Sequence, residues 1–117
     1  MFIPASVTDV ITKENKDAIT AKLIVEAANI PMPEAIEAEL LGKGIVIVPD
    51  IIANAGGVIS SYAEYRGYNP KRMFETVKKK ITKTVREVMT ESLKTRENPR
   101  TAALALAQAK VEAAMRA

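Results

Sequence analysis

The residues best suited to chemistry in this chain are small and polar. Asn29 and Asn54 each carry an amide that both donates and accepts hydrogen bonds, which suits recognition of an amide or a ribose. A Gly-Gly pair at 56–57 follows, and then the hydroxyls of Ser60 and Ser61. Because glycine lets a ligand approach the backbone closely, this composition is typical of a binding turn.

Other kinds of reactive group are absent from the sequence. Without cysteine there is no disulfide and no thiolate metal site, and without histidine the commonest general base and metal ligand is missing. A Ser-His-Asp or Cys-His arrangement within the chain is therefore excluded. Neither a G-x-G-x-x-G turn nor a P-loop occurs, so no phosphate cradle is predicted. The polar residues can orient a ligand, but none is a good general base.

Short runs rich in isoleucine or valine must position these residues. They are nearly continuous in apolar character, which is typical of strands buried on both faces of a parallel sheet. A polar segment that predicts a short helix separates the first two runs, and a second predicted helix precedes the third, so the pattern indicates an α/β fold. The predicted strands are 2–5, 22–28 and 44–49, and the predicted helices between them are 12–21 and 33–42.

The second half of the chain predicts helices only. Asn69 and Pro70 are typical of a helix start, and the apolar residues that follow keep helical spacing. The residues expected on that buried face are Phe74, Val77, Ile81, Val85 and Val88. With 117 residues, a single domain over 1–117 is expected. The predicted helices are 52–66, 70–95 and 99–115.

The candidate residues come where the predicted strands end. Parallel sheets bind ligands at the carboxyl ends of their strands. The stretches Pro4–Ser6, Glu26–Asn29 and Asp50–Gly57 follow the three predicted strands, and we call them the carboxyl-end rim. Each has a plain structural reading, since an asparagine after a strand often makes a turn and a Gly-Gly pair often permits close packing. Their combination on one rim favours a ligand.

Charge and hydropathy weigh against two classes of partner. The net charge is only +3, and the consecutive lysines at 78–80 point in different directions on a helix, so a solvated face is favoured over a nucleic-acid site. No apolar run has the length of a membrane span, and no signal-peptide pattern is present. A cytoplasmic location is the default expectation.

Several stretches resemble one known family, in order and over nearly the whole chain. "LIVEAAN", "KGIVIVPDIIANAGGV" and "RTAALALA" are similar to the C-terminal part of glutamate dehydrogenase, in the glutamate/leucine/phenylalanine/valine dehydrogenase family. The resemblance implies the second half of a Rossmann-like domain, with a three-stranded parallel sheet followed by C-terminal helices. It also implies NAD or NADP as cofactor and oxidative deamination of glutamate to 2-oxoglutarate and ammonia.

The resemblance also implies roles for individual residues. Ala5 matches a small residue beside the cofactor, and Asn29 and Asn54 match asparagines near its nicotinamide end. Val58 matches a residue lining the substrate side-chain pocket. Ser61 matches a serine that bonds the distal carboxylate of glutamate. Ala27 stands where a glycine is usual in the family.

The resemblance covers only part of a dehydrogenase, and this sets further expectations. The chain starts inside a predicted strand, so a missing N-terminal part of the enzyme is the expected partner, and the strand edge invites self-association. Alone, the chain is expected to be inactive and to bind NAD or NADP weakly or not at all. The alternatives are a non-catalytic α/β ligand- or partner-binding module, or part of a leucine or phenylalanine dehydrogenase. "YRGYNP" favours the last, and Ser61 argues against it.

Overall fold

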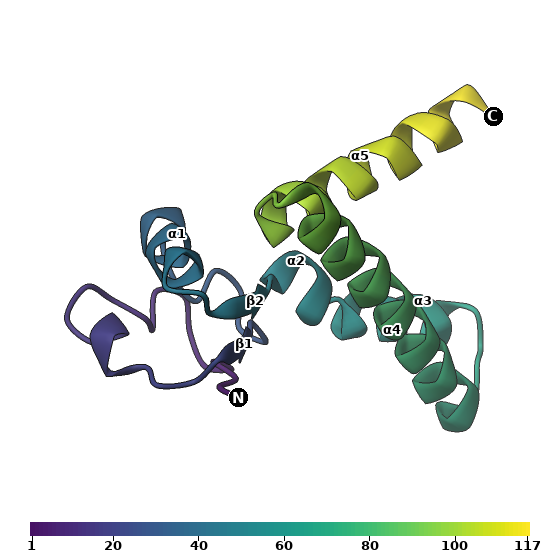
Figure 1. The fold of residues 1–117 in the computed structure, drawn as a ribbon. Helices are drawn as coiled ribbons and strands as arrows, with labels where there is room; N and C mark the ends of the chain where they lie inside the picture. Colours follow the sequence, from purple (N-terminus) through teal and green to yellow (C-terminus); the bar gives the residue numbers. More distant parts are fainter.

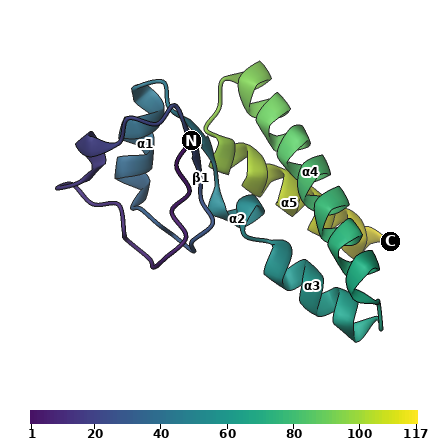
Figure 2. The ribbon, with the colours of Figure 1, turned by 90° about the horizontal axis from the view of Figure 1, so that it is seen from below.

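The molecule consists of a small parallel sheet and a group of packed helices (Figure 1). The computed structural model describes all 117 residues. Figure 2 shows the sheet with its helix on one side, the long helices on the other, and α2 between them. The elements in chain order are a 3-10 helix (Lys16–Ala18), β1 (Leu23–Val25), α1 (Glu34–Gly42), β2 (Val46–Val48), α2 (Asp50–Ala53), α3 (Gly56–Tyr65), α4 (Pro70–Thr95) and α5 (Pro99–Arg116).

The sheet is parallel, as predicted, but its strands are shorter than predicted. β1 and β2 pair in register, with Leu23 opposite Val46, so the predicted strands 22–28 and 44–49 shrink to three residues each. Ile24 and Ile47 at their centres are completely buried, and they pack against α1 in the first hydrophobic core. α1 then stops at a turn in which Gly44 has φ 83°, a left-handed conformation that glycine adopts without strain.

The predicted first strand, 2–5, is reduced to a single bridge. The Phe2 N–H donates to the Leu23 carbonyl oxygen (2.9 Å), and the Phe2 carbonyl oxygen accepts from the Val25 N–H (3.0 Å). Pro4 has no N–H to continue the ladder, which is one reason why the pairing stops. The segment nevertheless lies parallel to β1, so the order first segment, β1, β2 matches the expected three-stranded arrangement.

Two predicted helices are wrong in extent. The helix expected at 52–66 is interrupted, because α2 ends at Ala53 and α3 begins at Gly56, with a turn at Asn54 and Ala55 between them. Asparagine and glycine both have low helix propensity, so local preference does not favour one continuous helix here. The helix expected at 12–21 is only the 3-10 turn, because Asn15 bonds its neighbours instead: its Oδ1 accepts from the Thr12 N–H (2.7 Å) and its Nδ2 donates to the Val10 carbonyl oxygen (2.9 Å).

The two long helices begin where predicted. The Asn69 side chain caps α4 by accepting from the Arg72 N–H (2.9 Å), and the Asn98 side chain caps α5 by accepting from the Arg100 N–H (2.8 Å). The expected apolar face of α4 is buried at one end only: Val88 is 1% exposed, whereas Phe74 is 67% exposed. None of the helices combines the length and the apolar character needed to span a membrane.

The second core joins the sheet to these helices. Its buried members come from β2, α2, α4 and α5: Val48, Ile52, Val88, Ala102 and Ala103. The alanines let the start of α5 approach β2 and α2 closely. The far end of α5 projects away from the other helices, as Figure 1 shows, and Met115 there is 81% exposed.

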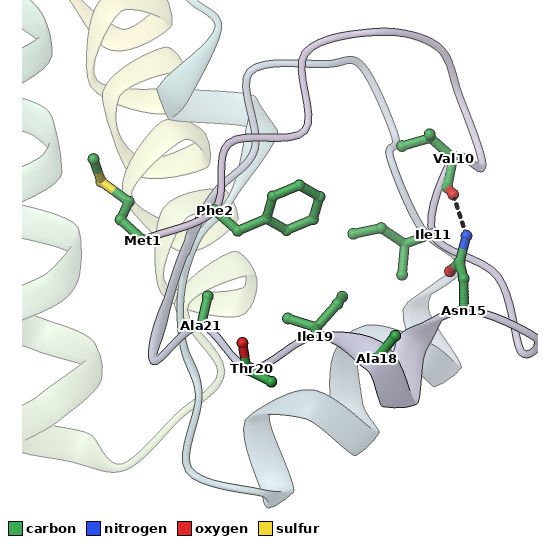
Figure 3. A pocket seen from close by; sticks show the side chains of 9 residues that line it. All are labelled: Met1, Phe2, Val10, Ile11, Asn15, Ala18, Ile19, Thr20 and Ala21. Carbon is green, nitrogen blue, oxygen red and sulfur yellow. Dashed lines mark hydrogen bonds between the residues drawn. The ribbon is translucent and has the colours of Figure 1, made fainter.

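The edge formed by the first segment is predicted to drive self-association. Both backbone groups of Phe2 form hydrogen bonds with β1, so the backbone groups of Ile3 point toward the open edge. The edge is also apolar, because Met1, Ile3 and Val7 are 78%, 47% and 66% exposed. An apolar hollow of about 480 Å³ opens beside the segment, between Phe2 and Ile19 (Figure 3). We expect dimers or larger species in small-angle scattering, and their loss in Ile3→Lys, because a charge on an exposed edge opposes pairing. A well-ordered monomer of the parent chain at the same concentration would contradict this.

Candidate functional site

The structure brings two turns of the carboxyl-end rim side by side. The Ala28 N–H donates to the Pro4 carbonyl oxygen (2.7 Å), and the Thr8 hydroxyl donates to the Asn29 carbonyl oxygen (2.9 Å). Ala5 and Asn29 therefore lie on adjacent turns at the ends of adjacent strands. Both residues are exposed, so the Asn29 amide is open to a ligand.

The third part of the rim is connected to these turns through Asp50. The Ile30 N–H donates to the Asp50 Oδ2 (2.7 Å), which joins the turn after β1 to the first residue of α2. Asn54 is the residue that follows the same short helix; its N–H donates to the Asp50 carbonyl oxygen (3.1 Å), and the residue is half-buried. Asn54 is thus held one helical turn from Asp50, the residue that bonds the turn carrying Asn29.

Val58 and Ser61 lie farther along, on α3. Val58 is 77% exposed, so nothing in the chain covers the surface on which it lies. The Ser61 hydroxyl donates to the Gly57 carbonyl oxygen (3.1 Å), and the Ser60 hydroxyl donates to the same oxygen (2.7 Å). Each hydroxyl still has lone pairs that can accept, but Ser61 must break this bond before it can donate to a carboxylate.

The two glycines at the start of α3 have different surroundings. A Cβ added at Gly56 would lie 3.4 Å from Val77 Cγ1, an ordinary van der Waals distance, so Gly56 faces α4 but the packing leaves room for a Cβ. A Cβ added at Gly57 would meet nothing within 4 Å. Close packing therefore requires neither glycine, and Gly57 leaves space that a ligand could enter.

A cluster of buried charges, which the sequence patterns did not predict, includes two residues of the rim. The guanidinium of Arg100 bonds three carboxylates: its Nε lies 2.9 Å from Glu37 Oε2, its Nη1 2.6 Å from Asp50 Oδ1, and its Nη2 2.8 Å from Glu26 Oε2. The acidic residues are 0%, 2% and 4% exposed for Glu26, Glu37 and Asp50. We call these four residues the Arg100 cluster.

Each member of the Arg100 cluster comes from a different element. Glu26 directly follows β1, Glu37 lies in the first turn of α1, Asp50 begins α2 and Arg100 is the second residue of α5. The Asp50 N–H also donates to Glu26 Oε2 (2.8 Å). A carboxylate that interrupts an apolar run, as Glu26 does, was the available signal, because a buried charge requires a partner.

Burial and pairing shift the ionisation of these groups in opposite directions. Burial raises the pKa of Glu26 to about 7, and its Oε1 is buried without a hydrogen-bond partner. Burial also acts on Asp50, but the Arg100 guanidinium and the N–H groups of Ile30 and Ile51 outweigh it and lower the pKa of Asp50. The carboxylates likewise outweigh burial at Arg100 and raise its pKa. Glu26 is therefore the member of the cluster whose protonated form burial favours.

Comparison with known proteins assigns the chain to a protein family. The sequence profile of the Glutamate/Leucine/Phenylalanine/Valine dehydrogenase family matches residues 1–117, and the chain therefore belongs to this family of amino-acid dehydrogenases. The glutamate dehydrogenase of Aeropyrum pernix is 51% identical over 65 residues, which are 56% of this chain and 16% of that enzyme. The resemblance seen in the sequence is confirmed.

Solved structures agree with the fold. The crystal structure of L-tryptophan dehydrogenase from Nostoc punctiforme superposes with a TM-score of 0.87 at 26% identity, over 99% of this chain and 35% of that one. Glutamate dehydrogenase from Peptoniphilus asaccharolyticus gives a TM-score of 0.83 at 31% identity, over 97% of this chain and 30% of that one. The α/β fold with C-terminal helices is confirmed, and the chain spans about a third of each solved enzyme.

Proposed function

We propose that this chain is the C-terminal half of the dinucleotide-binding domain of a cytoplasmic, NAD- or NADP-dependent glutamate dehydrogenase. The observation that carries the proposal is the family match over all 117 residues, in a structure whose rim turns are tied together by direct hydrogen bonds. The reaction would be oxidative deamination of glutamate to 2-oxoglutarate and ammonia. The bound nucleotide would supply the hydride acceptor, while the protein supplies orientation and electrostatics.

The rim residues fit one end of such a cofactor. Ala5 offers a small side chain, the Asn29 amide is exposed, and Asn54 stands at the end of α2, so we assign these three residues to the nicotinamide end. The open space at Gly57 would admit the amino acid beside it. Val58 would line the substrate side-chain pocket, and Ser61 would bond the distal carboxylate.

The remaining functions would come from the part of the enzyme that precedes this chain. We propose that it docks on the edge of the first segment and supplies the pyrophosphate turn and the catalytic base. A second candidate, a dehydrogenase of apolar amino acids, is favoured by one observation: the Ser61 hydroxyl is already bonded to Gly57 and is not free to donate.

A chimera tests the proposal and separates the two candidates. Residues 1–117 would replace the matching segment of the Peptoniphilus asaccharolyticus glutamate dehydrogenase. We expect oxidation of glutamate with NAD or NADP, at a higher kcat/KM than for leucine, phenylalanine or tryptophan. A folded chimera that prefers an apolar amino acid would establish the second candidate, and a folded chimera without activity on any of them would contradict both.

In the chimera, Ser61→Val is expected to lower kcat/KM for glutamate. The lost hydrogen bond to a carboxylate is worth about 1–3 kcal/mol, which is roughly ten- to hundredfold in rate. The matched control is Ser60→Val, because Ser60 donates to the same Gly57 oxygen, so its replacement removes a bond of the same kind from the helix. Equal glutamate kinetics in the two variants would remove the substrate role of Ser61.

The isolated chain is expected to have no dehydrogenase activity. It lacks a pyrophosphate turn and a general base, and the rim is only one wall of a cleft, so hydride donor and acceptor cannot be aligned. The measurement is the absorbance of reduced cofactor with glutamate, on chain purified away from host dehydrogenase. A sustained rate that disappears in Asn54→Ala would show that the chain forms a complete site by itself.

A further inference from the structure

The Arg100 cluster includes two residues of the rim, Glu26 and Asp50, and its contacts continue along the rim turns. Arg100 Nη1 bonds Asp50 Oδ1 (2.6 Å), and the other oxygen of the same carboxylate accepts the Ile30 N–H (2.7 Å). We infer that Arg100 is a positioning residue for the rim, which fixes Asp50 and through it the turns that carry Asn29 and Asn54. The inference rests on the proposed function for its catalytic meaning, and on the contacts alone for its structural meaning.

The turn after β1 needs such an anchor because its backbone is strained. Ile30 has φ 49°, in the left-handed region that a β-branched residue rarely adopts. Such a conformation persists only where the surroundings determine it. Here the Ile30 N–H is held by Asp50 and its carbonyl oxygen accepts from the Asp9 N–H (2.9 Å). Asn29 immediately precedes this residue, so the direction of its amide depends on that anchor.

The same carboxylate fixes the other side of the rim. Asp50 Oδ1 accepts the Ile51 N–H (2.7 Å), and the Asp50 N–H is held by Glu26 Oε2 (2.8 Å), which also bonds Arg100. The short helix α2 is therefore attached at its first residue, and Asn54 directly follows its last residue. One guanidinium on α5 thus sets the separation between the Asn29 turn and the Asn54 helix.

A neighbouring residue separates positioning from general stabilisation. Glu37 accepts a hydrogen bond from the Arg100 Nε (2.9 Å), but it lies on α1 and its side chain makes no hydrogen bond to the rim. Glu37→Gln should weaken the cluster and leave the rim anchored. Arg100→Lys retains the positive charge but cannot hold three carboxylates in the planar fork of the guanidinium, so the bond to Asp50 is compromised.

Amide hydrogen exchange on the isolated chain tests the structural part. In Arg100→Lys, exchange at Ile30 and Ile51 should accelerate about tenfold or more relative to Val46, whose N–H lies in the sheet ladder, as expected for a local opening. In Glu37→Gln, the exchange rates of all three amides should change by the same factor. A common factor for the three amides in Arg100→Lys as well would overturn the inference.

Exchange in the unmodified chain keeps the test decisive if Arg100→Lys fails to fold. The amides of Ile30 and Ile51 and the Nη1–H of Arg100, which bonds Asp50, should open as one unit, with one dependence on low concentrations of urea. Independent opening of Arg100 and Ile30 would overturn the inference.

Kinetics of the chimera test whether Arg100 positions the rim for catalysis. Arg100→Lys should lower kcat about tenfold more than Glu37→Gln does, with KM for the dinucleotide nearly unchanged, because small misplacements act on the reacting geometry. An active parent chimera with equal kcat in both variants would refute the positioning role and leave the proposed function intact. An inactive parent chimera would refute the proposed function, while the exchange results would still decide whether Arg100 anchors the rim.

Discussion

Arg100→Ala is expected to lower the free energy of unfolding by about 3–5 kcal/mol, because it leaves buried carboxylates without their compensating charge. Glu26, Glu37 and Asp50 would then face one another at 0%, 2% and 4% exposure, with no other cation bonded to them. A loss of this size is a large part of the total stability of an ordinary domain. The chain has a divided core, so it has little reserve with which to absorb it.

Urea denaturation followed by circular dichroism measures this loss. The control is Arg116→Ala on the same helix, where the arginine is 81% exposed and pairs only with Glu112, so a change within about 0.5 kcal/mol is expected. Adding Glu37→Gln to Arg100→Ala should recover part of the loss, since it removes one of the uncompensated charges. A parent-like midpoint for Arg100→Ala would mean that the carboxylates become neutral or hydrated at little cost.

The stability of the chain is expected to fall as the pH rises from about 4.5 to about 7. Burial raises the pKa of Glu26 from 4.5 to about 7, so the folded chain holds a proton that the unfolded chain releases. The contribution is complete below pH 4.5 and is lost as the pH approaches 7, by up to roughly 3 kcal/mol. Asp50 acts in the opposite sense, because its lowered pKa makes stability fall as the pH drops below 3.8. A maximum near pH 4 to 5 follows from the two shifts.

Glu26→Gln isolates the responsible group. The amide resembles the protonated carboxyl and cannot ionise, so its unfolding free energy should be nearly flat between pH 5 and pH 7, within about 1 kcal/mol. The control is Glu39→Gln, an exposed glutamate paired with Lys16, which should keep the slope of the parent. A parent slope that persists in Glu26→Gln would assign the proton to another member of the Arg100 cluster.

Local patterns in the sequence predicted much of the fold, because they depend on neighbouring residues. Asn69 and Pro70 set the start of α4, and isoleucine-rich runs located both paired strands. The same reasoning failed at 52–66, where a turn at Asn54 and Ala55 divides a run that is apolar enough for one helix. It also exaggerated burial on α4, since Phe74 has helical spacing but no neighbour to cover it.

The candidate site was predictable only where strand ends determine it. Parallel strands bring Ala5 and Asn29 to one edge, and the structure places them on adjacent turns. The Arg100 cluster was not predicted because its members are far apart in the sequence. Arg100 and Glu26 are separated by 74 residues, and Arg100 and Glu37 by 63. No local periodicity connects a charged residue near a helix start to a glutamate after a strand.

That separation has a consequence for synthesis on the ribosome. The sheet, α1 and α2 are all translated before Arg100, so a nascent chain must either leave Glu26 and Glu37 hydrated or bury them unpaired. Unpaired burial is costly, so the first half should stay open until α5 has emerged. A chain that stops before residue 100 would then expose its sheet residues to proteases, and incomplete copies of the protein would be removed.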